Sequence, residues 1–556
     1  MNETSPDFSD KISVKIEPIP FSEIPGQSTL FLDYQIDSRI IDNFYPEKHC
    51  PEKDFAEKVL ANYAVDREKL CDALLADNKE FGARIKTFIN IEMLRQKDCV
   101  AVVTGQQAGL FSGPVYTIYK ALSAVKMARD LREQNIKAVP VFWIAEEDHD
   151  FDEVKRAFFV DGEGRAAQVE NTPEGYRDNY PVGFVKLDRT IEQTVEEFFS
   201  ALPHTEFTEG LKEMVNGSYR PGETYGTAFA RFMMKLFADY GLILLAPLNQ
   251  NFKRLCSPIL VKALEKSDEL VSALLQVGNQ LSEENYHAQV LVESDSFPFF
   301  LQNEGGERRS LRRDPATGRI KVQNSETEFE KDELIRLAEN KPQYLSPNAL
   351  LRPVVQDFLL PTLVYFGGGA EIAYFAQNAV IYQILGRPVT PIRHRSSFTV
   401  LEGKHRRTLE KYKLHFRDLY AGQEKILETV VDKFLAQDTA RVFGEVEETI
   451  QNELNRLDRH LLESDPTLSG NLANRRKKIH WHLEALRKKF HRAELLKDEV
   501  AHRRVENLFR SVFPHNALQE RSLNVVPFLN LYGEYFLEWL YREVENNERR
   551  HQIFYL

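Results

Sequence analysis

The stretch Val100–Glu153 constrains the fold more than any other part of the chain, because it has the pattern of a βαβ unit. Two short apolar runs, Cys99–Val103 and Ala138–Ala145, are bounded by polar or turn residues, as buried parallel strands are. Apolar residues recur between them at helical spacing: Ile118, Leu122, Val125, Ala128 and Leu131. The pattern predicts an α/β fold with a Rossmann-like parallel-sheet core.

Polar residues follow both predicted strands, at the ends where open parallel sheets bind ligands. Gly105, Gln106 and Gln107 leave the first strand, and the acidic segment Glu146–Asp150 leaves the second. Glycines and the amino end of the helix after Pro114 favour an anion at the same place. The sequence predicts a ligand site here. The alternative is an ordinary strand-to-helix turn beside a solvated acidic loop.

The composition is that of a large cytoplasmic protein. The chain has 556 residues, and its net charge of −12 disfavours a general nucleic-acid binder. No apolar run is long enough to span a membrane, and the polar first residues lack the features of a secretion signal. The four cysteines are isolated in sequence, so we expect reduced thiols and neither a disulfide framework nor a metal site.

The predicted core is interrupted by segments of different character. Turn signals and short alternating runs mark insertions near Phe158–Leu187 and Ala288–Tyr344. A helix over Thr224–Tyr240, ending at Gly241, and the strand Thr362–Phe366 return to the core. The expected order is core 1–157, inserted connecting subdomain 158–220, core 221–287, second inserted subdomain 288–344, core 345–397, helical coiled coil 398–511 and a C-terminal return to the core, 512–556.

The segment Phe398–Arg510 has the apolar repeat of two long paired helices. One stripe comprises Ile479, Leu483, Leu486, Phe490, Ala493 and Val500, and the other Phe443, Val446, Ile450, Leu454, Leu457 and Leu461. A turn at Asp465–Gly470 predicts an antiparallel coiled coil, with helices of about 40 residues and roughly 60 Å. We expect its apolar face to bind a second copy of the chain. We interpret the basic run Arg475–Lys478 as a solvated face rather than a nucleic-acid patch.

Six motifs occur in one order along the chain. They are TGQQ-x-GLF-x-GP-x-Y at Thr104–Tyr116, FWIA-x-EDHDFDE at Phe142–Glu153, SPN-x-LLRPVVQD at Ser346–Asp357, EIAYFAQ at Glu371–Gln377, R-x-SFT at Arg395–Thr399 and LQER-x-LN at Leu518–Asn524. With these motifs the chain resembles the bacillithiol biosynthesis cysteine-adding enzymes, proposed ligases that join cysteine to glucosaminyl malate. It departs from the family pattern at Gly367–Glu371, which reads GGGAE in place of GGPGE.

The resemblance implies an interrupted Rossmann core of the kind found in class I aminoacyl-tRNA synthetases, and a homodimer formed through the coiled coil. It also implies a ligase that adds L-cysteine to the glucosamine amine of glucosaminyl malate, the last step of bacillithiol biosynthesis. The alternative is a non-catalytic nucleotide-binding or scaffold protein that assembles through its coiled coil. The polar density of Asp148–Glu153 favours the enzyme, since a scaffold would not need it.

Amide formation needs a deprotonated amine, and His149 is the natural candidate for the base. Its neighbours Asp148 and Asp150 are candidates to orient the ring, and as carboxylates they also favour the protonated imidazolium. Two alternatives stay open: a metal site built from His149 and acids, and a histidine that only orders its loop.

The carboxylates and hydroxyls of glucosaminyl malate require amide donors and a cation. The candidate substrate-binding residues are Gly105, Gln106, Gln107, Asn348, Arg352 and Gln356. Arg352 suits a bidentate contact with a carboxylate, and its alternative role is a buried ion pair with Asp357. Asn348 precedes a predicted helix, so its alternative role is a helix cap.

The resemblance also implies an adenine-nucleotide site, for ATP or ADP, where the core meets the coiled coil. Its candidate residues are Arg393, Arg395, Ser397 and Asn524, and we expect this site to be separate from that of the substrate. The alternative is that these residues tie the arm to the core. The chain carries neither the synthetase lysine motif nor a zinc-binding set of cysteines and histidines, so the sequence does not identify how cysteine is activated.

Overall fold

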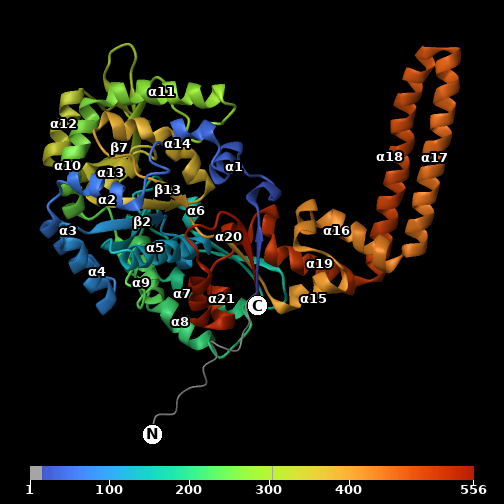
Figure 1. Ribbon diagram of the computed structural model, residues 1–556. Helices are drawn as coiled ribbons and strands as arrows, with labels where there is room; N and C mark the ends of the chain where they lie inside the picture. Colours follow the sequence, from blue (N-terminus) through green and yellow to red (C-terminus); the bar gives the residue numbers. More distant parts are fainter. Residues whose placement is uncertain (1–14, 304) are drawn as a thin grey trace, which may run out of the picture.

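A parallel five-stranded sheet forms the centre of the protein (Figure 1), in a computed structural model that describes residues 15–303 and 305–556. The strand order is β13-β12-β2-β3-β6, and every neighbouring pair is parallel. The strands are β2 (Val100–Gln106), β3 (Ala138–Ile144), β6 (Ile243–Leu245), β12 (Thr362–Gly367) and β13 (Ile392–His394). This sheet confirms the predicted α/β fold with a Rossmann-like core.

The predicted βαβ unit is formed by β2, helix α5 (Tyr116–Glu133) and β3. All residues of β3 and all but the last of β2 are buried, which explains their continuous apolar sequences. The chain continues from β3 to β6 on one side of β2 and later returns to the other side with β12 and β13. The direction of strand order therefore reverses between β2 and β12, and ligands bind at such reversals.

Both predicted insertions contain antiparallel β-structure. The first has the hairpin of β4 (Arg156–Val160) and β5 (Ala166–Glu170), followed by α7 (Thr190–Ala201) and α8 (Thr208–Asn216). The second has a five-stranded sheet in the order β10-β9-β8-β7-β11. Its strands are β7 (Ser296–Gln302), β8 (Arg308–Arg313), β9 (Ile320–Val322), β10 (Glu328–Phe329) and β11 (Leu345–Pro347).

Helices cover the sheet and carry the insertions. They are α1 (Thr29–Gln35), α2 (Glu52–Ala61), α3 (Arg67–Glu80), α4 (Ile85–Arg95), α6 (Phe151–Val154), α9 (Tyr225–Leu236), α10 (Gln250–Glu265), α11 (Ser267–Glu283), α12 (Lys331–Asn340), α13 (Arg352–Leu359) and α14 (Gly369–Ile384). The end predicted for α9 was wrong: the helix stops at Leu236, and Gly241 lies in the following turn with a φ of +71°.

A small sheet brings the two ends of the described chain together. The strand β15 (His551–Tyr555) pairs antiparallel with β1 (Lys15–Ile19) and parallel with β14 (Phe398–Leu401). Three short helices precede β15: α20 (Gln519–Ser522), α21 (Val526–Tyr532) and α22 (Tyr535–Glu543). The C-terminal segment thus ends in a sheet with β1 and β14.

The helical arm projects from the rest of the molecule (Figure 1). It comprises α17 (Gln437–Ser464) and α18 (Pro466–Lys497), and its base is formed by α15 (Gly403–Lys411), α16 (Gln423–Val430) and α19 (Glu499–Val512). The antiparallel pair was predicted, but the turn was placed wrongly, because α18 already begins at Pro466 with Asp465 as its cap. The helices have 28 and 32 residues, so they span about 42 and 48 Å rather than 60 Å.

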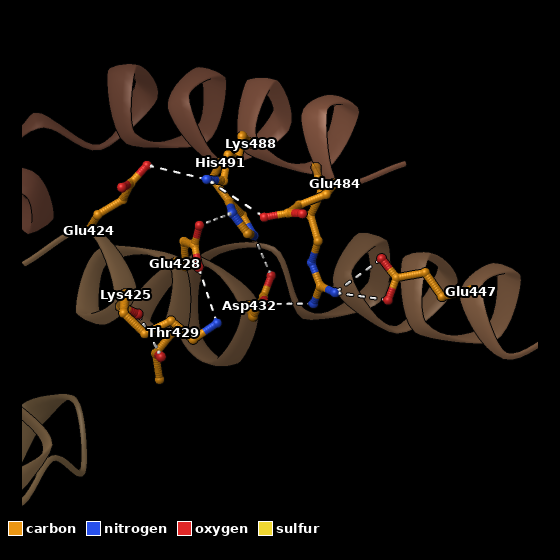
Figure 2. A network of polar contacts seen from close by, with 10 residues as sticks. Glu424, Lys425, Glu428, Thr429, Asp432, Glu447, Glu484, Lys488 and His491 are labelled. Carbon is orange, nitrogen blue, oxygen red and sulfur yellow. Dashed lines mark hydrogen bonds and ion pairs between the residues drawn. The ribbon is translucent and has the colours of Figure 1, made fainter. Parts of the chain in front are cut away.

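The seam of the arm is more polar than predicted. Phe443 and Phe490 pack with ring centroids 5.4 Å apart, whereas Leu486 is 55% exposed and faces away from the seam. Figure 2 shows the polar contacts at the base, where His491 Nε2 lies 2.8 Å from Asp432 Oδ1 and Arg487 donates to Asp432 at 2.8 Å. Arg487 follows Leu486 and occupies the inward position, which displaces the predicted apolar register.

Within the described residues, no helix is both long enough and apolar enough to cross a membrane.

Candidate functional site

An ion pair marks the point where the strand order reverses. Lys120 of α5 donates to the backbone oxygen of Gly105 at 2.8 Å and to Gln106 Oε1 at 2.9 Å. Its ammonium also lies 2.5 Å from Glu371 Oε2, at the start of α14. One buried lysine thus joins the carboxyl end of β2 to the helix that follows β12.

Burial and charge act against each other in this pair. Burial lowers the pKa of Lys120, although the Glu371 carboxylate raises it again. Burial alone would raise the pKa of Glu371, but the Lys120 ammonium holds it below its usual value. Tyr365 OH and the Gly368 amide each donate to Glu371 at 2.8 Å. The pair is therefore ionised and its carboxylate is satisfied by hydrogen bonds.

Gly105 has to be a glycine for the site to keep this shape. A Cβ atom at this position would lie 2.6 Å from the backbone oxygen of Trp143 on the neighbouring strand. The close approach sets where β2 ends and hence where Gln106 and Gln107 project. Gln107 Nε2 donates to Asp148 Oδ2 at 2.8 Å, so the polar clusters after β2 and β3 meet as predicted.

His149 is held by an arginine from the second insertion. Arg308 donates to His149 Nδ1 at 2.9 Å and to Ser346 Oγ at 2.9 Å. Its guanidinium lies over the Phe300 ring, 3.7 Å from the centroid. The prediction that Asp148 and Asp150 orient the ring was wrong: Asp148 Oδ1 accepts from the His149 backbone amide at 2.7 Å and lies 3.8 Å from the ring nitrogen.

The protonation state of His149 follows from this arrangement. Burial and the Arg308 charge lower the pKa of His149, and together they outweigh the opposite effect of the two neighbouring carboxylates. An arginine can only donate, hence Nδ1 accepts and the proton of the neutral ring resides on Nε2. In this state His149 offers a hydrogen-bond donor to a ligand.

A cavity of about 250 Å³ opens beside Gln106 and Gln107. The C-terminal segment forms its opposite wall with Arg521 and Asn524. Burial raises the pKa of Glu153, a further lining residue, above its usual value. His149 and Arg352 do not line this cavity, whereas Asn524 does. Gln106, Gln107 and Asn524, which were expected at two separate sites, therefore line the same cavity.

Three predicted substrate contacts have partners within the protein. Asn348 Oδ1 accepts from the amides of Leu350 and Leu351 at 3.1 and 2.9 Å, so it stabilises the turn before α13, whose cap position is Leu351. The alternative of an Arg352–Asp357 ion pair was wrong. Arg352 donates to Tyr374 OH at 2.9 Å and to Gln356 Oε1 at 3.2 Å. The fully buried Gln356 separates Arg352 from Asp357, to which it donates at 3.0 Å.

The predicted nucleotide contacts are junction residues in this structure. Arg395 is buried and pairs with Glu520 at 2.7 Å, and Ser397 Oγ donates to the same carboxylate at 2.8 Å. Arg393 pairs with Glu52 at 2.5 Å. The Asn524 amide donates to backbone oxygens of the loop before α5, including that of Gly113 at 2.9 Å. Arg395, Ser397 and Asn524 thus tie the C-terminal region to the core, whereas Arg393 joins β13 to α2 within the core.

The helix N-terminus expected to attract an anion is also engaged, since the Val115 amide donates to the Leu523 backbone oxygen at 2.8 Å. For metals, the described residues contain no group of three or more histidine, cysteine or acidic side chains placed to hold an ion. The polar groups that the site offers to a ligand are therefore amides, carboxylates and arginines.

Sequence reasoning missed Lys120, Arg308 and Glu371. Lys120 interrupts the apolar face of a predicted helix, and a lysine buried at such a position signals a specific partner. Glu371 opens the EIAYFAQ motif, so its sequence did carry a signal. Arg308 stands in a run of arginines on a short strand, and nothing in that run distinguishes it from its half-buried neighbours.

Comparison with known proteins assigns the chain to a family. Residues 14–396 match the family described as Bacillithiol biosynthesis BshC, N-terminal Rossmann-like domain, and residues 398–556 match the BshC C-terminal coiled-coil domain. The chain belongs to the BshC family. The two matched regions meet at the start of β14, where the sheet core gives way to the helical region.

Relatives of the BshC family cover nearly the whole chain. A protein of Salinibacter ruber is 32% identical over 99% of both chains, and one of Solibacter usitatus is 34% identical over 96% of this chain and 98% of its own. A Geobacillus protein is 31% identical, covering 89% and 91%. Each bears the name "Putative cysteine ligase BshC".

Proposed function

We propose that this protein is a ligase that joins the carboxyl of L-cysteine to the glucosamine amine of glucosaminyl malate, as the last step of bacillithiol biosynthesis. The names of its BshC relatives support ligation of cysteine. The observation that carries the proposal is the neutral His149, held by Arg308 beside Asp148 and Gln107 at the carboxyl ends of β2 and β3. Scaffolding alone would not require this arrangement.

The geometry suggests how the reacting groups are served. The Nε2–H of His149 donates to the carbonyl oxygen of a cysteine carboxyl that carries an activating group, where negative charge develops as the amine attacks. The new C–N bond replaces the bond to the activating group, which departs with the electron pair of that bond. The exposed Asp150 carboxylate accepts the proton that the amine releases. Asp148 keeps the loop in place through the His149 backbone amide and Gln107. In this scheme His149 is a donor, and a carboxylate is the base.

The proposal includes an adenine nucleotide without assigning it a reaction step. Arg393, Arg395, Ser397 and Asn524 fit its phosphates poorly, because each already makes an ion pair or hydrogen bond within the protein. The cavity beside Gln106 is the better place to seek a nucleotide, since it is lined by Arg521 and by Arg156.

The test is product formation. The purified protein is mixed with cysteine and glucosaminyl malate, with and without ATP, and the amide is sought by mass spectrometry. We expect product from the wild type, and at least a hundredfold less from His149→Ala and from Asp148→Asn. His287→Ala, at an exposed histidine far along the chain, is the matched control. Normal turnover by both site variants, with unchanged circular dichroism, would return the cluster to a structural role.

We also propose that the protein is a homodimer formed through the arm. Large apolar side chains stay exposed on α17 and α18: Val442, Val446, Leu457, Leu462, Leu468, Trp481, Leu486 and Leu496. Exposed apolar surface of this extent on a narrow arm is typical of an interface. Light scattering should give the mass of a dimer at micromolar concentration, and the double variant Trp481→Glu/Leu486→Glu should give a monomer. A monomeric wild type would contradict the proposal.

A further inference from the structure

Glu146 opens the acidic segment that follows β3, and the proposed reaction gives it no role. The residue is buried, with 5% of its surface exposed. Its amide donates to the backbone oxygen of Ile144 at 2.7 Å, which closes a tight turn at the end of the strand. The chain therefore changes direction at Glu146, three residues before His149.

Three segments that are distant in sequence converge on Glu146. Its backbone oxygen accepts from the amide of Gly183, in the first insertion, at 2.9 Å. Its Oε1 accepts from the amide of Leu248, which follows β6, at 3.1 Å. Gly226, in the first turn of α9, packs against its Oε2. One side chain thus joins the end of β3 to the insertion, to β6 and to α9.

Two glycines form a cradle around the carboxyl group of Glu146. A Cβ atom at Gly183 would lie 2.8 Å from Glu146 Oε2, and one at Gly226 would overlap the same oxygen. Neither glycine has a positive φ, so the close approach, and not the backbone conformation, requires glycine here. The glycine cradle, Gly183 and Gly226, is therefore shaped to hold this carboxyl group.

The cradle holds a carboxyl group without a cation. Within the described residues Glu146 makes no ion pair, because Lys253 of α10, the cation that faces it, pairs with Glu147 instead. Burial raises the pKa of Glu146 to about 8, with a further contribution from Glu147 and Asp77, while Lys253 and the Leu248 amide oppose the shift. At neutral pH the group is therefore a neutral carboxylic acid.

The contacts of Glu146 continue into the loop of His149. The amide of Val182, next to Gly183, donates to the backbone oxygen of Asp148 at 2.7 Å. Asp148 Oδ1 in turn accepts from the His149 amide at 2.7 Å. The place of the histidine therefore depends on how the insertion is seated against Glu146.

We propose that Glu146 is a positioning residue for the ligase reaction, which acts as a neutral acid in the glycine cradle and thereby holds the loop of His149 against the first insertion. Loss of its proton would leave a buried carboxylate without a cation, which costs free energy until the cradle opens. The effect on catalysis rests on the proposed function, whereas the effect on the loop does not.

Two substitutions separate the shape of the side chain from its charge. Glu146→Gln stays neutral at every pH, so its kcat at pH 7 should be within about threefold of the wild type, whereas Glu146→Ala empties the cradle and should lower kcat at least about tenfold. From pH 7 to 9 the kcat of the wild type should fall about tenfold relative to that of Glu146→Gln. Glu265→Ala, at an exposed glutamate of α10, is the matched control and should behave as the wild type.

Two further measurements on the full-length protein need no turnover. In histidine-selective NMR, the His149 resonances of the wild type should shift with an inflection near pH 8, and those of Glu146→Gln should not. Between about pH 4.5 and 8 the unfolded chain loses the Glu146 proton that the folded chain keeps, so this group lowers the stability of the wild type as the pH rises. The urea midpoint of Glu146→Gln should therefore increase relative to the wild type from pH 5 to 8.

Three results would overturn the proposal. The first is a constant difference in urea midpoint between the wild type and Glu146→Gln at all pH values, and the second is no inflection of His149 near pH 8. The third is a folded Glu146→Gln that is as inactive as Glu146→Ala. If the wild type forms no amide but the NMR and urea results are as expected, the proposed function fails and the positioning of the loop by Glu146 stands.

Discussion

The central sheet, with its junction to the C-terminal region, and the helical arm use charged residues in opposite ways. At the sheet and its junction the ion pairs are buried: the Lys120 side chain is 3% exposed, and those of Arg395 and Glu520 are 6% and 2% exposed. Along the arm, pairs such as Arg441–Glu445 expose more than half of both side chains. Desolvated charges depend on their partners, whereas solvated charges do not. Ion pairs therefore fix the geometry of the side chains at the sheet, whereas along the arm they mainly make the helix surface hydrophilic.

The largest effect is expected at the reversal of strand order. Lys120→Met leaves Glu371 without its cation, and breaking a buried pair in this way costs about 3–5 kcal/mol of unfolding free energy. Urea denaturation measures this loss. Arg129→Met, which breaks an exposed pair on the same helix, should change the unfolding free energy much less than Lys120→Met does. The double variant Lys120→Met/Glu371→Leu should recover part of the loss. Equal losses of unfolding free energy in Lys120→Met and Arg129→Met would contradict the difference between buried and exposed pairs.

A second effect concerns pH at the small sheet. His551 is buried between the hydroxyls of Ser397 and Thr399. Burial lowers its pKa to about 4, although Glu520 opposes the shift and Arg395 supports it. As the pH falls below about 6.5, the unfolded chain binds a proton that the folded chain does not, so stability should fall between about pH 6.5 and 4.

The size of this pH effect is at most about 3 kcal/mol, from 1.36 kcal/mol per pKa unit. The comparison that isolates it is the pH dependence of urea unfolding in wild type and His551→Gln. The variant should lose less stability on acidification, because it lacks the group that titrates. Parallel curves for the two proteins would show that His551 is not the titrating group.

The third prediction concerns Arg308, a buried cation near the sheet that contacts the proposed catalytic histidine. Arg308→Ala should lower product formation about 10–100-fold, or roughly 1.4–2.7 kcal/mol, because the His149 ring loses its orientation. Loss of the neighbouring charge should also raise the pKa of His149, which NMR titration would detect. Arg312→Ala, at an arginine of the same strand that pairs with Glu293 and Asp295, is the control. An unchanged pKa in Arg308→Ala would contradict the contact.

Local pattern predicted the core but not the contacts that cross it. The βαβ unit is encoded by periodicity within about 50 residues, so its strands and the meeting of Gln107 with Asp148 could be predicted. Arg308 reaches His149 across 159 positions of sequence, from a strand whose pairing is not a local property. Lys120 and Glu371 meet only because β12 lies beside β2, and the strand order could not be inferred from the strands themselves.

The predicted register of the arm was wrong for a different reason. A repeat of seven identifies a helical stripe, but it does not decide which side of the stripe faces the partner helix. Leu486 belongs to the repeat and points outward, while Arg487 points to Glu447 and Asp432. Polar contacts at the base thus rotate the seam away from the predicted apolar register. The outward apolar residues are those that the proposed dimer would cover.

The smallest effect is expected at the base of the arm, where the comparison is easiest to break. Arg487 contacts Asp432 and Glu447 (Figure 2), but its side chain is still 28% exposed. Arg487→Ala should therefore lower the unfolding free energy by only about 1 kcal/mol, measured by urea denaturation beside the exposed control Arg441→Ala. Burial of His491 against the same Asp432 argues for a larger value. A loss above about 2 kcal/mol would mean that the charges of this network depend on their partners as strongly as the Lys120 pair does. The boundary between regions with buried and with exposed ion pairs would then lie between the base of the arm and its tip.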